Sequence, residues 1–158
     1  MPKSSKDHSP RILNRRARHE YHILETLETG ISLLGTEVKA VRDGRVSLAE
    51  GFARIDPKDM SLYLHDVDIA RYSHGGPHQH EPKRPRRLLA HKSQIEKMLG
   101  LTTAKGTTIV PLAMYFRRGW VKVELGVGRG KRHYDKRQDL KTREAREQVQ
   151  RAMTRKRI

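Results

Sequence analysis

The last 28 residues of the chain, 131–158, cannot form part of a hydrophobic core. They contain 11 Lys or Arg against 4 Asp or Glu, a net charge of +7, and only four large aliphatic side chains. Ordering a segment costs conformational entropy, and burial of so few apolar groups cannot offset that cost. The fold must therefore be built from the preceding residues, and residues 131–158 are predicted to be a basic tail that binds a polyanion.

Positive charge is concentrated at both ends of the chain. Of the formal net charge of +16, residues 1–19 carry +5 and residues 20–130 only +4. This asymmetry indicates a folded body with arms that bind nucleic acid, and RNA is the partner we expect. A membrane surface is a weaker alternative, because no apolar run could span a bilayer and the tail lacks a row of large apolar side chains.

The remaining sequence predicts a small, mainly β domain. We expect residues 1–14 to be disordered, 15–130 to form the body and 131–158 to be disordered in the free protein. Apolar alternation and turn residues predict the following elements: strands at 21–28, 46–55 and 60–69, a hairpin of 107–116 with 120–127, and helices at 33–42 and 93–101. Closure into a barrel removes exposed strand edges, so an OB-like antiparallel barrel is the expected fold.

Two details of these elements can be tested in a structure. Ser93 with Glu96 three residues later has the spacing of a capping box, which predicts that Ser93 is the N-cap of its helix. Gly126, Gly128 and Gly130 lie between the last strand and the tail, and we interpret them as a hinge.

The chain offers little for catalysis or metal binding. It has no cysteine, which excludes disulfides and thiolate chemistry. His74, His78 and His80 lie close together, but without a cysteine or paired carboxylates we interpret them as part of a polar loop. We expect no catalytic residues, no metal and no cofactor. Residues 1–19 lack the apolar region of a secretory signal, so a cytoplasmic protein is expected.

Two basic clusters in the body are candidate RNA contacts. Lys83, Arg84, Arg86 and Arg87 precede a pair of leucines, and we favour phosphate binding over a solvated loop for this cluster. Arg15, Arg16 and Arg18 precede Tyr21, and guanidinium groups beside an aromatic ring can stack on bases.

Several motifs resemble the SmpB family of SsrA-binding proteins. They are NRRARHEY at 14–21, ETGISLLGTEVKAVRDGRVSL at 28–48, RRLLAHKSQI at 86–95, VPLAMYFRRGWVKVELGVGRGKRHYDKR at 110–137 and DLKTRE at 139–144. The resemblance implies a six-stranded OB-like barrel with about three short helices. It implies an adaptor, not an enzyme, that binds the transfer-RNA-like domain of transfer-messenger RNA (tmRNA) and brings it to stalled ribosomes for rescue and peptide tagging.

The resemblance also assigns residues to two surfaces. Those implied to bind tmRNA are Asn14, Arg15, Arg16, Arg18, Glu28, Arg86, Arg87, Leu89 and Lys122. Those implied to bind the ribosome, where the tail becomes helical in the empty messenger channel near the decoding centre, are Lys131, Arg132, Tyr134, Asp135, Lys136, Arg137, Lys141 and Arg143. Elongation factor Tu and alanyl-tRNA synthetase are implied partners through the shared RNA, and we expect a monomer.

The chain departs from the family pattern at Pro85, Ala90 and Ala145, where members often carry Thr, Leu and a large aromatic residue. Two other functions stay open at this point. A structural ribosomal protein is also small, basic and tailed. A basic ribonuclease or RNA-modifying enzyme is a weaker alternative, because no residue set in the sequence would carry its chemistry.

Overall fold

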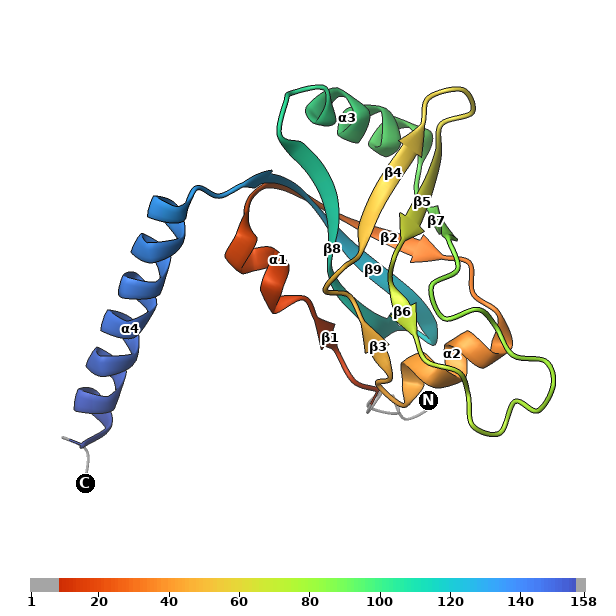
Figure 1. The fold of residues 1–158 in the computed structure, drawn as a ribbon, viewed down its shortest axis with the longest axis horizontal. Coiled ribbons are helices and arrows are strands. Elements are labelled where there is room, and N and C mark those ends of the chain that lie inside the picture. The colour runs from red at the N-terminus through yellow and green to blue at the C-terminus, as the bar shows by residue number, and fades with distance from the viewer. Residues whose placement is uncertain (1–8, 156–158) are drawn as a thin grey trace, which may run out of the picture.

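The computed structural model describes residues 9–155, except for the side chains of residues 133 and 134. Six antiparallel strands close into a ring in the order β8-β4-β5-β7-β2-β9, and β9 returns to pair with β8 (Figure 1). The ring consists of β2 (Tyr21–Ile31), β4 (Phe52–Asp56), β5 (Ser61–His65), β7 (Arg86–Leu89), β8 (Thr107–Arg117) and β9 (Trp120–Gly130). The expected six-stranded barrel is confirmed.

Short elements extend the barrel. Strand β1 (Ile12–Leu13) pairs with β8, and β3 (Val46–Ser47) pairs with β6 (Asp68–Ile69) in a separate two-stranded ribbon. Three helices belong to the body: α1 (Arg15–Glu20), α2 (Gly35–Arg42) and α3 (Lys92–Thr102). A fourth helix, α4 (His133–Arg155), continues from β9 and projects away from the barrel (Figure 1).

The hairpin of β8 and β9 forms as predicted. Its two-residue turn has both central residues in the left-handed region, with φ of 52° at Arg118 and 81° at Gly119. Positive φ at both positions is the type I′ geometry, whose twist matches that of the flanking strands. Val121, Val123 and Leu125 face the core, while Trp120 on the opposite face is 74% exposed.

The glycines after this point are not a hinge, and that prediction was wrong. Gly126 and Gly128 are buried inside β9. A Cβ at Gly126 would lie 2.8 Å from Leu112 Cδ1, and one at Gly128 would lie 2.9 Å from Tyr21 Cβ. The glycines are needed because neighbouring side chains pack directly against the β9 backbone.

The predicted boundaries at the N-terminus and at α3 also need correction. Residues 12–14, expected to be disordered, join the body through β1 and Asn14, whereas residues 1–8 lie outside the described residues. The N-cap of α3 is His91 and not Ser93, and the His91 N–H donates to Gln94 Oε1 at 3.1 Å. Gln94 therefore occupies the N3 position that had been assigned to Glu96.

Candidate nucleic-acid interface

A groove on the outside of the barrel brings three of the predicted RNA-binding residues together. Strand β2 lies between β7 and β9, so that Gly30 is paired with Leu89 on one side and Lys122 on the other. Glu28, Leu89 and Lys122 line one part of this groove. An adjoining part of about 730 Å³ extends past Trp120.

Gly30 keeps this groove open. A Cβ at this position would stand 3.3 Å from the Leu89 Cβ, which is a tight contact. Leu89 itself is 54% exposed, although it is a large apolar residue. An exposed leucine and an exposed tryptophan beside a lysine form a surface that can receive both the face of a base and a phosphate.

Glu28 is held in place by a network from β8. Its carboxylate accepts hydrogen bonds from the Tyr115 hydroxyl and from Arg117 Nη1, the latter at 3.1 Å. The Tyr115 hydrogen bond is the main reason that the pKa of Glu28 lies below its ordinary value, with Arg117 and Lys122 contributing. Glu28 is therefore ionised, and it can accept hydrogen bonds from base amino groups or 2′-hydroxyls but would repel phosphate.

Replacing Tyr115 with Phe is expected to raise the pKa of Glu28 towards its ordinary value. A carboxyl whose pKa is lowered by folding contributes stability above its unfolded pKa and loses it as pH falls through the folded pKa. Tyr115→Phe should therefore destabilise the protein at neutral pH and have little effect below the folded pKa of Glu28. NMR titration of the Glu28 carboxyl would measure the change in its pKa. Urea unfolding at neutral pH and at a pH below the folded pKa of Glu28 would measure the change in stability.

Tyr63→Phe is a suitable control, because Tyr63 is a half-buried tyrosine in another strand of the same barrel. It should leave the pKa of Glu28 unchanged. A Tyr115→Phe protein with an unchanged Glu28 pKa would contradict the assigned network.

Arg86 is not on the surface, so its assignment to direct RNA contact is corrected. Its side chain is fully buried and its Nε pairs with the buried carboxylate of Glu37 in α2. The other guanidinium nitrogens donate to the carbonyl oxygens of Val67 at 2.8 Å and Pro82 at 2.9 Å. Arg86 thus fixes β7, the strand that carries Leu89, to α2 and to the loop before β7.

The buried carboxylate of Glu37 is fully satisfied. Burial alone would raise its pKa, but the Leu34 N–H, Arg84 and Arg86 donate to it and together hold the pKa below its ordinary value. Arg84 Nη2 lies 2.5 Å from Glu37 Oε1. Burial lowers the pKa of Arg86, yet a guanidinium stays protonated at neutral pH, so the interior contains a charged pair.

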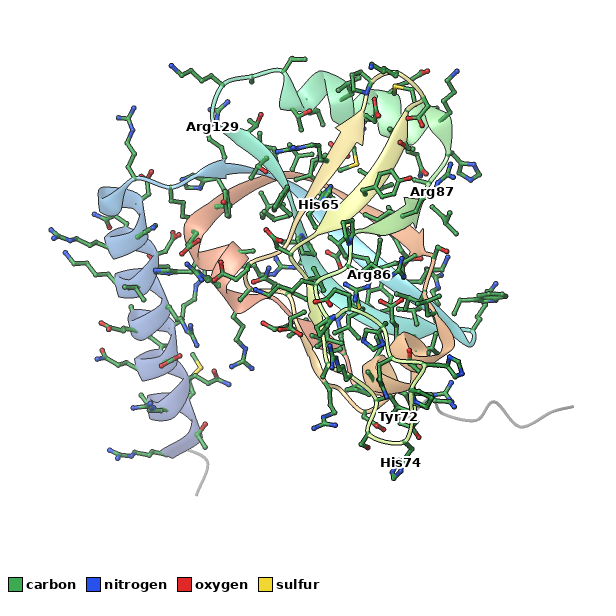
Figure 2. The ribbon with its side chains drawn as sticks, turned by 45° about the vertical axis from the view of Figure 1, so that its right-hand side comes forward. His65, Tyr72, His74, Arg86, Arg87 and Arg129 are labelled. Carbon is green, nitrogen blue, oxygen red and sulfur yellow. The ribbon has the colours of Figure 1, made fainter. Side chains whose placement is uncertain are left out.

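Arg87 takes the opposite orientation to Arg86. Successive residues of a strand face opposite sides, and Arg87 is exposed on the outer face of β7 together with Leu89. Figure 2 shows Arg86 within the fold and Arg87 at its periphery. Of the two neighbouring arginines, only Arg87 can reach a ligand.

The loop before β7 is anchored by His80. This side chain is buried, with Nε2 at 2.8 Å from the Ile69 carbonyl oxygen and Nδ1 at 2.8 Å from Thr36 Oγ1. Because a carbonyl only accepts, Nε2 carries the proton in the neutral ring and Nδ1 accepts from Thr36. Within residues 9–155 no group of three potential metal ligands is found. The loop is polar as expected, but His80 also has a structural role, because it fixes the loop to Ile69 and Thr36.

A second basic surface surrounds α1. Arg15, Arg16 and Arg18 are exposed, and Arg16 pairs with Glu20 at 3.0 Å and Glu50 at 2.7 Å. This short helix was not predicted, since Ala17 is its only buried residue and no apolar periodicity marks it.

Asn14 precedes α1 and is buried, so its assignment to direct RNA contact is also corrected. Its Oδ1 accepts from the Ala17 N–H at 3.1 Å, and its Nδ2 donates to the carbonyl oxygens of Leu48 and Pro111 at 3.1 and 2.8 Å. Asn14 therefore caps α1 and joins three segments of the chain.

The base of the tail is attached to the body beside this surface. The Lys131 N–H donates to the Glu20 carbonyl oxygen at 2.8 Å, and Lys131 Nζ donates to the Arg18 carbonyl oxygen at 3.1 Å and pairs with Asp139. Asp135 Oδ2 lies 3.3 Å from His22 Nε2. Lys131 and Asp135, both predicted to bind the ribosome, thus contact the body in this structure.

The other predicted tail residues face solvent to different degrees. Lys136 is half-buried, and four more are exposed: Arg132, Arg137, Lys141 and Arg143. Arg143 pairs with Glu147 one turn further along the helix at 3.3 Å. The side chain of Tyr134, also implied to bind the ribosome, lies outside the described residues.

Comparison with known proteins identifies the family. A family profile described as SmpB protein matches residues 11–155. The SsrA-binding protein of Thermobifida fusca is 48% identical over 157 residues, which is 98% of this chain and 97% of the relative. That of Acidothermus cellulolyticus is 52% identical over 143 residues, covering 90% of this chain and 89% of the relative.

A solved structure described as "tmRNA-SmpB: a journey to the center of the bacterial ribosome" also matches. It is 48% identical, with a TM-score of 0.67, and the match covers 79% of this chain and 87% of that one. Within residues 9–155, no helix has the length and apolar character required to cross a bilayer. With the profile, relatives and fold in agreement, the chain belongs to the SmpB family of SsrA-binding proteins.

Proposed function

We propose that this protein is the tmRNA-binding adaptor of trans-translation. The groove of Glu28, Leu89 and Lys122 receives the transfer-RNA-like domain of tmRNA, and the basic tail guides the complex into a stalled ribosome. The observation that carries this proposal is the meeting of these three side chains, which are distant in sequence, on one open groove. The role is one of binding, with no catalytic step.

The chemistry of the groove suits a folded RNA. Lys122 supplies a cation for phosphate, Leu89 and Trp120 offer apolar surface, and the Glu28 carboxylate accepts hydrogen bonds from 2′-hydroxyls or base edges. Lys122 is partly exposed, and its positive charge contributes to the lowered pKa of the ionised Glu28. A mixed acidic and basic site discriminates between RNA shapes better than a purely cationic surface does.

The tail has the properties expected of a segment that becomes stable only on RNA. The large apolar side chains of α4 stay largely exposed, with Val149 at 55% and Met153 at 65%. Helices stabilised by little packing are marginal in water. We infer that the free tail populates this helix only in part, and that ribosomal RNA in an unoccupied messenger channel completes it. Elongation factor Tu and alanyl-tRNA synthetase would meet the protein through the RNA that they share, in the cytoplasm.

Lys122→Ala is expected to weaken binding to the transfer-RNA-like domain of tmRNA about tenfold, the effect of losing one charge-assisted contact. The salt dependence of binding should also become shallower by roughly one phosphate contact. Filter binding or fluorescence titration at several salt concentrations would measure both effects.

Lys105→Ala is the matched control, because Lys105 is an exposed lysine in the turn before β8 and lies outside the groove. It should bind as the unmodified protein does. If the unmodified protein shows no preference for tmRNA over bulk transfer RNA at physiological salt, the proposed function is wrong.

A further inference from the structure

The outer face of β4 and β5 carries a row of aromatic and cationic side chains that the groove does not include. Three register pairs define it: Phe52 with His65, Arg54 with Tyr63, and Tyr63 with Arg87 of β7. The intervening residues, such as Leu62 and Leu64, point into the core. We call these five outward residues, Phe52, Arg54, Tyr63, His65 and Arg87, the β4–β5 strip.

Two aromatic groups of the strip, Phe52 and His65, form a stacked pair. The rings of Phe52 and His65 are stacked, with centroids 5.2 Å apart and planes at 16°. The Arg54 guanidinium lies 5.6 Å from the centre of the Phe52 ring. Phe52, Tyr63 and His65 are each only partly buried, so part of every ring is exposed to solvent.

The cations of the strip are accessible to a ligand, because Arg54 and Arg87 are both exposed. The two acidic residues of the β4–β5 turn are engaged locally. Asp56 accepts from the Lys58 N–H at 3.0 Å, and Asp59 accepts from the Ser61 N–H at 3.1 Å. The Ser61 hydrogen bonds are the main cause of the lowered pKa of Asp59, and the charge of Arg87 contributes least. The two turn carboxylates thus have hydrogen-bond partners within the turn, while Arg87 stays exposed.

The strip is continuous with the proposed RNA groove. Arg87 lies two residues before Leu89 on the same face of β7, and Leu89 is the register partner of Gly30 beside Lys122. Figure 2 shows Arg87 at the periphery of the barrel and His65 on β5 towards the middle of the view, whereas Tyr72 and His74 lie on the loop at the far end. A ligand in the groove therefore reaches the strip along the outer face of β7.

We propose that the β4–β5 strip is a stacking platform for unpaired nucleotides of the RNA bound in the groove. Bases stack on exposed aromatic rings and on guanidinium planes with little sequence preference, and flanking arginines neutralise the backbone. A purely acidic protein partner would use the arginines but would leave three partly exposed rings without a role. The inference rests on the proposed function and adds a second contact region to it.

The test compares two substitutions at Tyr63. Tyr63→Leu removes the aromatic face and is expected to weaken binding to the transfer-RNA-like domain of tmRNA about tenfold, as the loss of one stacked base would. Tyr63→Phe keeps the ring and should bind as tightly as the unmodified protein. Phe52→Leu is a second loss-of-ring variant, and thermal unfolding of every variant confirms that the barrel is folded.

Tyr72→Leu is the matched control outside the strip, since Tyr72 is also partly buried and also faces a cation, Lys39 Nζ at 5.2 Å. It should leave affinity unchanged. Ultraviolet crosslinking of the unmodified complex, followed by mass spectrometry, should place nucleotides on Phe52 or Tyr63.

The outcomes separate the two proposals. If Lys122→Ala weakens binding while Tyr63→Leu and Phe52→Leu do not, the stacking platform is rejected and the groove stands. Equal weakening by Tyr63→Phe and Tyr63→Leu would also reject stacking. If the unmodified protein fails to select tmRNA, the proposed function fails first, and the platform with it.

Discussion

Simultaneous replacement of Asp135, Lys136 and Arg137 with alanine is expected to abolish peptide tagging while leaving affinity for tmRNA within about twofold. The three residues lie at the start of α4, and none of them lines the groove that receives tmRNA in our proposal. Substitutions at sites without shared partners act independently. The loss of Lys136 and Arg137 alone removes two charge-assisted contacts to ribosomal RNA, each worth about 1.5–3 kcal/mol, which is enough to reduce tagging by orders of magnitude.

A second triple variant in the same helix is the matched control. Glu147→Ala, Arg151→Ala and Arg155→Ala also removes one acid and two bases, so the change in net charge is the same. Alanine has the highest helix propensity, so the substitutions do not weaken α4 in either variant. A loss of tagging would therefore not come from a lower helix propensity. The control should retain most tagging in a purified translation system with a truncated messenger. Equal losses of tagging and of tmRNA affinity in the first variant would contradict the division between groove and tail.

Arg86→Ala is expected to destabilise the protein by about 3–5 kcal/mol, the usual cost of breaking a buried ion pair by removing one of its members. The buried Glu37 carboxylate would lose the hydrogen bond from Arg86 Nε. The carbonyl oxygens of Val67 and Pro82 would lose the hydrogen bonds from the other two guanidinium nitrogens. An effect of this size is a large fraction of the stability of a small domain. Urea unfolding followed by circular dichroism measures it directly.

The neighbouring residue provides an internal comparison. Arg87→Ala removes the same side chain one position later, on the exposed face of β7. It should change the free energy of unfolding by less than about 0.5 kcal/mol and should weaken RNA binding instead. Similar destabilisation by both variants would show that the Arg86–Glu37 pair does not support the fold as described.

The contrast between Arg86 and Arg87 shows where reading the sequence fails. Both residues belong to one basic cluster, and charge alone assigns both to a ligand. The strand alternation of Arg86 with the buried Leu88 was a signal that Arg86 faces inward. Its partner, Glu37, lies 49 residues earlier, so the pair could not be recognised before the fold was known.

Local patterns were sufficient for other parts. The apolar alternation and turn residues predicted the hairpin of 107–116 with 120–127, because turn chemistry and side-chain period act over a few residues. Asn14 was a missed local signal, since Asn three residues before a helical N–H is a favoured N-cap.

The site required information that local patterns do not contain. Glu28, Leu89 and Lys122 were predicted from family motifs, but their meeting on one groove depends on ring closure that places β2 between β7 and β9. The β4–β5 strip depends on register, and a shift of one residue would turn Tyr63 into the core. Neither feature could be derived from composition or spacing.

The short connection between β9 and α4 has a mechanical consequence. Only Lys131 and Arg132 separate the last strand residue from the first helical one, and Lys131 is hydrogen-bonded to the body. Each residue added to a helix rotates all later residues by about 100° around the helix axis. A single insertion or deletion at this junction would therefore rotate α4 about its axis and turn a different set of its side chains towards any given side. The connection to the barrel thus fixes the rotational orientation of the tail helix.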